Sequence, residues 1–114
     1  MTEKQREIIE GLDWRIHEWS YSDGEKVYEL QKASPAGEDF SFSVDGEHLI
    51  EQIQSMAAEF DPDVHAEEWV TARQRGTDKT IPDIRTLIKD ADAIKEMLEE
   101  LAEEISQKGW EETK

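Results

Sequence analysis

The 114-residue sequence contains no cysteine. This absence excludes disulfide bonds and any metal site built on thiolates, and it is typical of proteins that stay in the cytoplasm. No apolar run approaches the roughly 18 residues that a membrane-spanning helix requires. The first residues also lack the apolar core of a secretion signal. We therefore expect a cytoplasmic protein without a membrane segment.

Basic residues are scarce. Lysine and arginine number 13 against 29 aspartates and glutamates, which gives a net charge of −16. No lysine or arginine lies between Lys32 and Arg73, although this interval contains ten acids. Such a charge repels nucleic acid and anionic membranes and attracts basic surfaces, so we expect no direct nucleic-acid binding. The simpler interpretation, that the acids only keep a small protein in solution, stays open.

Length and composition are those of one domain, residues 1–114. The hydrophobic content of 36% is enough for one modest core.

Residues 82–108 are predicted to form one long helix. Its apolar residues recur at intervals of three and four, at Ile84, Leu87, Ala91, Ile94, Leu98, Leu101 and Ile105. Ile88 and Met97 widen this heptad seam into a stripe suited to a domain core. Thr80 and Pro82 favour a helix start, and Gly109 with Trp110 favours its end. At 1.5 Å per residue the helix spans about 40 Å. It therefore crosses the whole domain, or projects and pairs with a second copy.

The rest of the chain predicts a sheet followed by helices. A short helix over residues 2–10 ends at Gly11, and alternating segments at 13–20, 26–32 and 40–44 predict three strands. Further helices are predicted over residues 47–60 and 62–73, with Asp61 as the N-cap of the second. The predicted fold class is α+β: a three-stranded antiparallel meander packed against helices, in the order α-β-β-β-α-α-α with a long C-terminal helix.

The alternation also predicts which side chains face the core. In the strands we expect these to be Trp14, Ile16, Tyr28, Leu30, Phe40, Phe42 and Val44. Trp19 falls on the opposite face of its strand. We expect it to pack within the fold as well, with a contact surface as the alternative. In the helix over residues 62–73 the candidates are Val64, Trp69 and Val70.

The best metal candidate is the segment DPDVHAEE, residues 61–68. His65 and Glu68 are three apart and share a helix face, but Asp61 and Asp63 already serve the helix N-terminus. The spacing matches neither a zinc-protease nor a calcium-loop motif. Three histidines in separate elements, with no cysteine and no phosphate loop, offer no recognisable nucleophile or base. We expect no enzyme, no catalytic residue, no metal and no cofactor.

Three segments together carry a resemblance: YELQKASPAGEDFSFSVDG (28–46), EFDPDVHAEEWV (59–70) and IPDIRTLIKDADAIKEMLEELAEEI (81–105). They resemble a family of short acidic proteins carried on phages, plasmids and conjugative elements of low-GC bacteria, over roughly residues 5–106. Small acidic proteins of such mobile genetic elements include anti-CRISPR and antirestriction inhibitors, several of which imitate DNA. The resemblance therefore implies a protein–protein interaction with a host defence protein. It assigns no individual binding residue.

The leading hypothesis is an acidic protein-binding module that acts as a DNA mimic. It would occlude a basic nucleic-acid-binding surface on a host protein, such as a Cas9-type effector or a restriction enzyme. The long helix is predicted to carry acids on its outer face at Asp90, Asp92, Glu96, Glu99, Glu100, Glu103 and Glu104. The expected partner-binding residues are Glu59, Asp61, Asp63, Glu67, Glu68, Glu96, Glu99, Glu100, Glu103 and Glu104. The alternative is a structural or regulatory homodimer, formed through the long helix, whose acidity serves only solubility.

Overall fold

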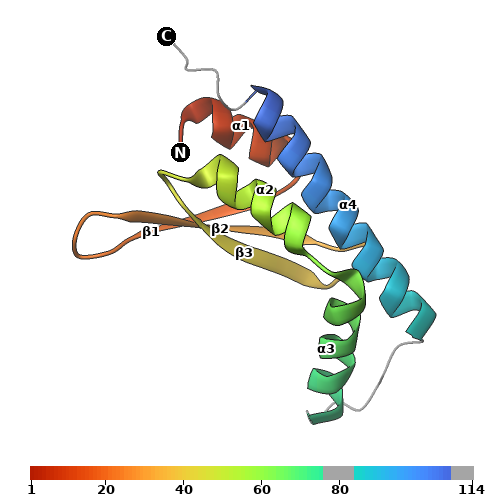
Figure 1. Cartoon of the computed structure of the whole chain (residues 1–114). Coiled ribbons are helices and arrows are strands. Elements are labelled where there is room, and N and C mark those ends of the chain that lie inside the picture. The colour runs from red at the N-terminus through yellow and green to blue at the C-terminus, as the bar shows by residue number, and fades with distance from the viewer. Residues whose placement is uncertain (76–83, 109–114) are drawn as a thin grey trace.

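In the computed structural model the chain has the predicted order of elements (Figure 1). Residues 1–75 and 84–108 are described, without the side chains of 69, 70, 72–75 and 84. The elements are α1 (Glu3–Gly11), β1 (Arg15–Ser20), β2 (Lys26–Ala33), β3 (Asp39–Asp45), α2 (Leu49–Glu59), α3 (Pro62–Arg75) and α4 (Ile84–Lys108). The predicted α+β class and the long last helix are confirmed.

The three strands form an antiparallel meander with β2 in the centre. Leu30 of β2 lies opposite Ile16 on one side and Phe42 on the other, so these three side chains share the inner face. The two connecting turns each place a glycine in the left-handed region, with φ +87° at both Gly24 and Gly37. A side chain is strained in that conformation, which is why glycine stands there.

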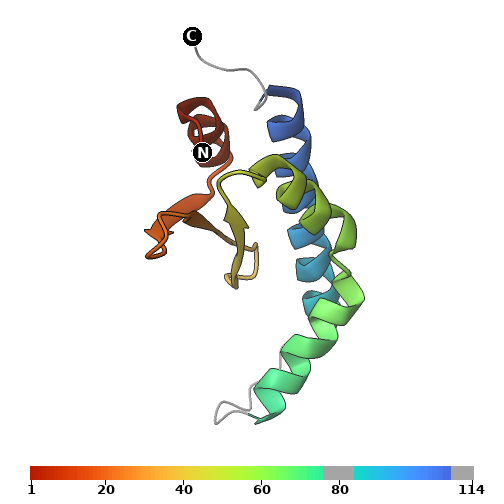
Figure 2. The same ribbon diagram turned by 60° about the vertical axis from the view of Figure 1, so that its left-hand side comes forward.

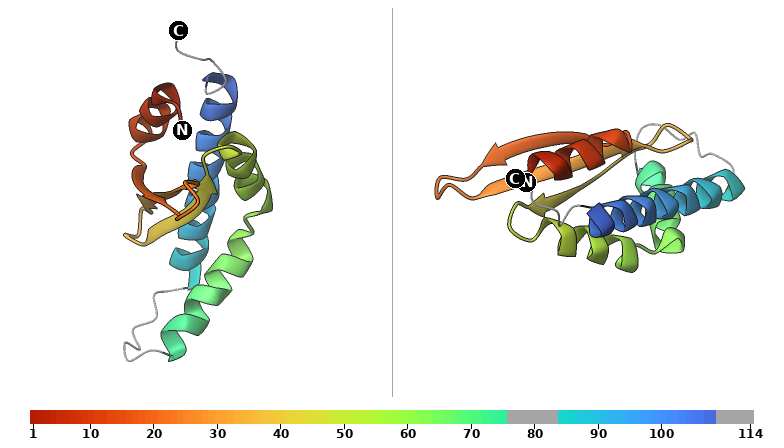
Figure 3. Two further views of the ribbon diagram at one scale, coloured as in Figure 1. Left: turned by 90° about the vertical axis from the view of Figure 1, so that its left-hand side faces the viewer. Right: turned by 90° about the horizontal axis from the view of Figure 1, so that it is seen from above.

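Helices α1, α2 and α4 cover one face of the sheet (Figure 3). The buried side chains of the sheet meet those of the helices in one core, which includes Trp14, Tyr28, Leu30, Phe42, Val44, Ile53 and Leu98. Trp14 packs edge-on against Phe40 and Phe42, with ring centroids 6.4 and 5.7 Å apart. The opposite face of the sheet carries exposed serines. The predicted inward residues of β2 and β3 are confirmed, with Phe40 only partly buried.

Helix α4 buries its heptad seam within the chain. Its 25 residues span about 37 Å at 1.5 Å each, along a molecule whose longest dimension is 51 Å. Each of Leu87, Ala91, Ile94, Leu98, Leu101 and Ile105 is at most 1% exposed, and Met97 packs beside them. A homodimer through the long helix remains a prediction, but it would need a face other than this covered seam.

The prediction that Asp90 lies on the exposed outer face of α4 is wrong, because Asp90 is only 4% exposed. Its Oδ2 accepts a hydrogen bond from Ser34 Oγ at 2.7 Å, and its Oδ1 accepts one from the Ala36 backbone N–H at 2.9 Å. Ser34 Oγ in turn accepts from the Glu38 N–H at 3.0 Å. The carboxylate therefore fastens α4 to the β2–β3 turn, and the donors of that turn compensate its loss of water.

Three apolar side chains predicted to pack are exposed instead. Val64 is 47% exposed because the first turn of α3 turns Ala66, not Val64, toward Leu87 and Ala91. Ile88 is 41% exposed because it lies about a quarter turn from Leu87, on the half of α4 that meets α3 and the β2–β3 turn and not the main core. Trp19 is 39% exposed because it lies on the uncovered face of edge strand β1.

Helix boundaries shift by one or two residues. Thr2 forms a capping box with Gln5, so α1 begins at Glu3. The left-handed residue after α1 is Asp13, with φ 67°, and Gly11 still belongs to the helix. The predictions for Thr80, Pro82, Gly109, Trp110 and the side chains of Trp69 and Val70 lie outside the described residues. None of the described helices combines the length and apolarity needed to cross a bilayer.

Candidate functional site

The second half of α4 carries the densest group of predicted binding residues. Glu96, Glu99, Glu100 and Glu103 are exposed, and none forms an ion pair with another described residue. They span seven residue steps, about 10 Å, which corresponds to one charge per roughly 3.5 Å along the helix axis. One strand of B-DNA carries one charge per about 3.4 Å of axis. The buried seam fixes the rotation of α4, so these carboxylates are presented outward by a rigid support.

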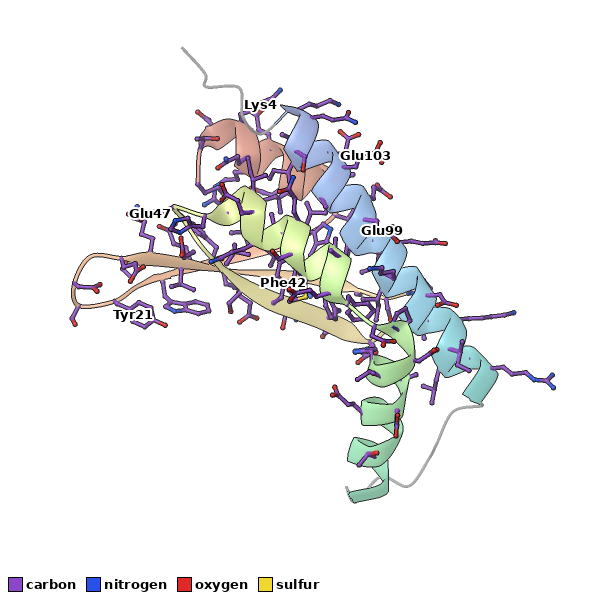
Figure 4. The ribbon with its side chains drawn as sticks, in the orientation of Figure 1. Lys4, Tyr21, Phe42, Glu47, Glu99 and Glu103 are labelled. Carbon is purple, nitrogen blue, oxygen red and sulfur yellow. The ribbon has the colours of Figure 1, made fainter. Side chains whose placement is uncertain are left out.

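Figure 4 shows Glu99 and Glu103 projecting from the side of α4 that faces away from the sheet. The Glu103 carboxylate accepts a long hydrogen bond of 3.4 Å from Gln107. Glu104, also a predicted contact, is only partly exposed and pairs with Lys108 at 2.9 Å. We name Glu96, Glu99, Glu100 and Glu103 the α4 acid row, and leave out Glu104 because its charge is already compensated.

The predicted acids around α3 form a separate group. Glu59 ends α2, Asp61 precedes α3, and Asp63, Glu67 and Glu68 lie within α3; all of them are exposed. Asp61 Oδ1 accepts from the Asp63 and Val64 backbone N–H groups at 3.0 and 3.4 Å, which confirms its N-cap role. Helix α3 extends from the end of the molecule opposite α1 (Figure 2). The acids of α3 therefore lie farther along the long axis than the second half of α4, whereas Glu59 follows the groove residue Ala58 at the end of α2.

Lys95 lies among the acids of α4, but its ammonium group points toward α2. Lys95 stands four residues before Glu99, a spacing at which lysine and glutamate commonly pair on a helix. Its Nζ instead donates to the backbone carbonyl of Ala57, in the last turn of α2. That carbonyl is one of the helix-end acceptors that lack a partner within their own helix. Within the described part of the chain Glu99 consequently has no ion-pair partner, although a lysine stands one helical turn before it.

An open groove of about 420 Å³ lies beside this lysine, between α2 and α4. Alanines contribute to its lining from both helices, at Ala57, Ala58 and Ala102, and Glu99 and Glu103 stand at its α4 side. Sequence reasoning missed the groove. The small residues were visible in the sequence, but nothing in the sequence indicated that α2 lies beside this part of α4.

His65 takes part in a contact between elements and does not turn toward Glu68. Its Nε2 lies 3.3 Å from Glu38 Oε2, and its ring packs against Phe60 and Phe40 at centroid distances of 5.2 and 6.0 Å. Among the described residues no three histidine, aspartate or glutamate side chains are arranged to hold a metal ion. The segment from 61 to 68 therefore joins α3 to the sheet and caps its own helix.

The remaining histidines are apart from each other. His17 is exposed on β1, and His48 precedes α2 with Nδ1 3.2 Å from Asp45 Oδ2. A hydrogen bond from the His48 backbone, with a further one from its ring, lowers the pKa of Asp45 below its usual 3.8. The same side-chain hydrogen bond and the charge of Asp45 raise the pKa of His48 above 6.5. This pair closes the turn from β3 into α2.

Comparison of the chain with protein-family models, with curated proteins and with solved structures finds no match in any of the three.

Proposed function

We propose that this protein is a non-enzymatic binding module whose acidic helical surface occupies a basic, nucleic-acid-binding surface of another protein. The observation that supports it most is the α4 acid row. Four carboxylates stand exposed on a helix fixed by its buried seam, without an ion pair to any described residue. Their axial density of about one charge per 3.5 Å is close to that of one DNA strand. A surface that binds phosphates therefore meets a comparable charge here.

Two physical effects would act in such a complex. Opposite net charges accelerate the encounter, and this attraction weakens with salt because the Debye length is about 8 Å at physiological ionic strength. Once in contact, carboxylates accept paired hydrogen bonds from arginine guanidinium groups much as phosphates do. The Glu99 and Glu103 carboxylates are one helical turn apart on the same face, which allows neighbouring arginines to be engaged together.

The nature of the partner rests on the resemblance to mobile-element proteins. That resemblance favours a host defence protein with a basic DNA-binding channel, of which a Cas9-type effector and a restriction enzyme are the two candidates. The group around α3, Glu59 to Glu68, is the second candidate contact in this proposal. Its position farther along the long axis suits a groove that follows an extended nucleic acid.

Competition with duplex DNA tests the proposal. The α4 variant replaces Glu96, Glu99, Glu100 and Glu103 by lysine. A matched control replaces four exposed glutamates at other sites by lysine, at Glu3, Glu7, Glu25 and Glu47. Each variant is titrated into a Cas9-type effector and into a restriction enzyme, and both DNA binding and cleavage are measured. Circular dichroism confirms that both variants remain folded.

We expect the parent protein and the control to displace DNA, and the α4 variant to be at least about 100-fold weaker, because four attractive contacts become repulsive. Since both variants carry the same net charge, a difference between them reports on position and not on total acidity. An α4 variant that inhibits as well as the parent would show that the binding surface is wrongly placed. If the parent displaces DNA from neither enzyme, the proposed class of partner is wrong.

A further inference from the structure

We infer that the groove between α2 and α4 receives an arginine side chain from the basic partner. This inference rests on the proposed function, but it concerns a feature that net charge alone does not provide. The groove has a volume of about 420 Å³ and lies beside the α4 acid row. Alanine methyl groups and two carboxylates line it, together with Gln54, Lys95 and Ser106. An arginine side chain has an apolar stem that can lie on the alanines and a charged end that can reach the carboxylates.

The apolar part of the groove comes from small side chains. Ala57 is buried where α2 packs on α4, Ala58 is exposed beside it, and Ala102 faces them from α4. Gln54 Nε2 donates to Ser106 Oγ at 2.7 Å, so α2 and α4 are also joined by a hydrogen bond at the groove. Methyl groups of this kind suit the three methylene groups of an arginine, which pack on apolar surface while the charged end stays outside.

The carboxylates at the groove can bind a cation because Lys95 does not form an ion pair with them. Lys95 and Glu99 have the spacing of a helical ion pair, but the lysine donates to the Ala57 carbonyl. Among the described residues Glu99 thus has no ion-pair partner, and Glu103 accepts only the long hydrogen bond from Gln107. Lys95 lines the groove and directs its ammonium to the Ala57 carbonyl, so the two carboxylates stay available to an incoming cation.

Arginine fits this arrangement better than lysine does. Its planar guanidinium offers five N–H donors and can reach two carboxylates one turn apart, whereas an ammonium acts as a compact point charge. The guanidinium is also more weakly hydrated, so it loses less when it lies against alanine methyl groups. The acid row by itself attracts both residues. The groove adds a preference between them.

Two blocked peptides test the preference, one with four Gly-Arg repeats and one with four Gly-Lys repeats. Binding is measured by calorimetry and by amide shifts of the isotope-labelled protein. The decisive variant is Ala58→Leu, which fills the groove from an exposed position without changing charge. Its control is Ser55→Leu, which adds the same bulk to an exposed position on α2 outside the groove lining.

We expect the wild type and Ser55→Leu to bind the arginine peptide about tenfold more tightly than the lysine peptide. Amide shifts should centre on Ala57, Ala58 and Ala102. Ala58→Leu should lose this preference and still bind the lysine peptide as the wild type does. Equal binding of both peptides by the wild type, or an unchanged preference in Ala58→Leu, overturns the arginine site and leaves the acidic surface proposal in place. No binding of either peptide also overturns it, and the DNA competition then judges the proposed function separately.

Discussion

Replacing Asp90 by alanine should destabilise the fold far more than its place on an acidic helix suggests. The variant removes the acceptor of two hydrogen bonds, from Ser34 Oγ at 2.7 Å and from the Ala36 N–H at 2.9 Å. Ser34 is 5% exposed, so its hydroxyl would lose its acceptor while largely out of water, although its oxygen would still accept from the Glu38 N–H. Hydrogen bonds to a charged group contribute roughly 1.5–3 kcal/mol each, and an unsatisfied buried donor costs roughly 1–3 kcal/mol.

We therefore expect Asp90→Ala to lower the free energy of unfolding by about 3 kcal/mol. With a slope of about 1.5 kcal/mol per molar urea, the unfolding midpoint falls by about 2 M. Asp92→Ala is the matched control, since Asp92 is an exposed carboxylate two residues later on the same helix. It should change stability by no more than about 0.5 kcal/mol, because alanine's higher helix propensity is its main effect.

A double-mutant cycle with Ser34→Ala separates the hydrogen bond from other consequences of the change. Removing both partners should cost less than the sum of the two single changes, by about 1 kcal/mol. The reasoning fails if Asp90→Ala and Asp92→Ala have equal midpoints, because Asp90 would then behave as a solvated surface acid.

Two further predictions concern stability. Leu98→Ala should lower the free energy of unfolding in urea by about 3 kcal/mol, because Leu98 is fully buried. Ile88→Ala should lower it by less than about 1 kcal/mol, because Ile88 is 41% exposed. Similar losses in the two variants would mean that the buried seam is wrongly assigned. Folding lowers the pKa of Asp45, so this residue stabilises the fold above pH 3.8 and the stabilisation is lost as the pH falls. Folding raises the pKa of His48, so this residue stabilises the fold below pH 6.5 and the stabilisation is lost as the pH rises. The difference in urea midpoint between wild type and Asp45→Asn should therefore be largest between these two pH values, and a difference that is constant with pH would contradict the pairing.

The parts of the fold that the sequence predicted are those where burial on one side leaves a local pattern. The alternation of phenylalanine and serine in β3 and the three-four spacing of α4 each follow from the geometry of one element. For that reason the inward positions Phe42, Leu98 and Leu101 were correct. The N-cap role of Asp61 was equally predictable, since a capping side chain bonds to residues two and three positions later.

The errors arose where burial depends on a distant segment. Asp90 was assigned to the outer face because it is charged, and only the donors of the β2–β3 turn, more than 50 residues earlier, make its burial favourable. Ile88 is predicted to join the core because it widens the apolar stripe, but this half of α4 packs on α3 and the β2–β3 turn and not on the main core. The groove required knowledge that α2 lies beside α4 at Lys95. The spacing of apolar residues along one helix predicts none of these contacts with distant segments.

The distribution of ion pairs bears on the choice between the proposed function and acidity that serves solubility alone. Among the described residues Arg6 bridges Glu10 and Glu18, Lys26 also pairs with Glu18, and Arg15 pairs with Asp39, whereas Lys32 donates to the Leu12 carbonyl. On the second half of α4, Lys95 donates to a backbone carbonyl, and Lys108 at the helix end pairs with Glu104. Acidity that only maintains solubility does not require unpaired acids to be grouped on one helix face, because interspersed charges of both signs serve solubility as well. A surface that attracts a cationic partner requires unpaired acids on one side, since acids already paired with lysines would be compensated before the partner arrived.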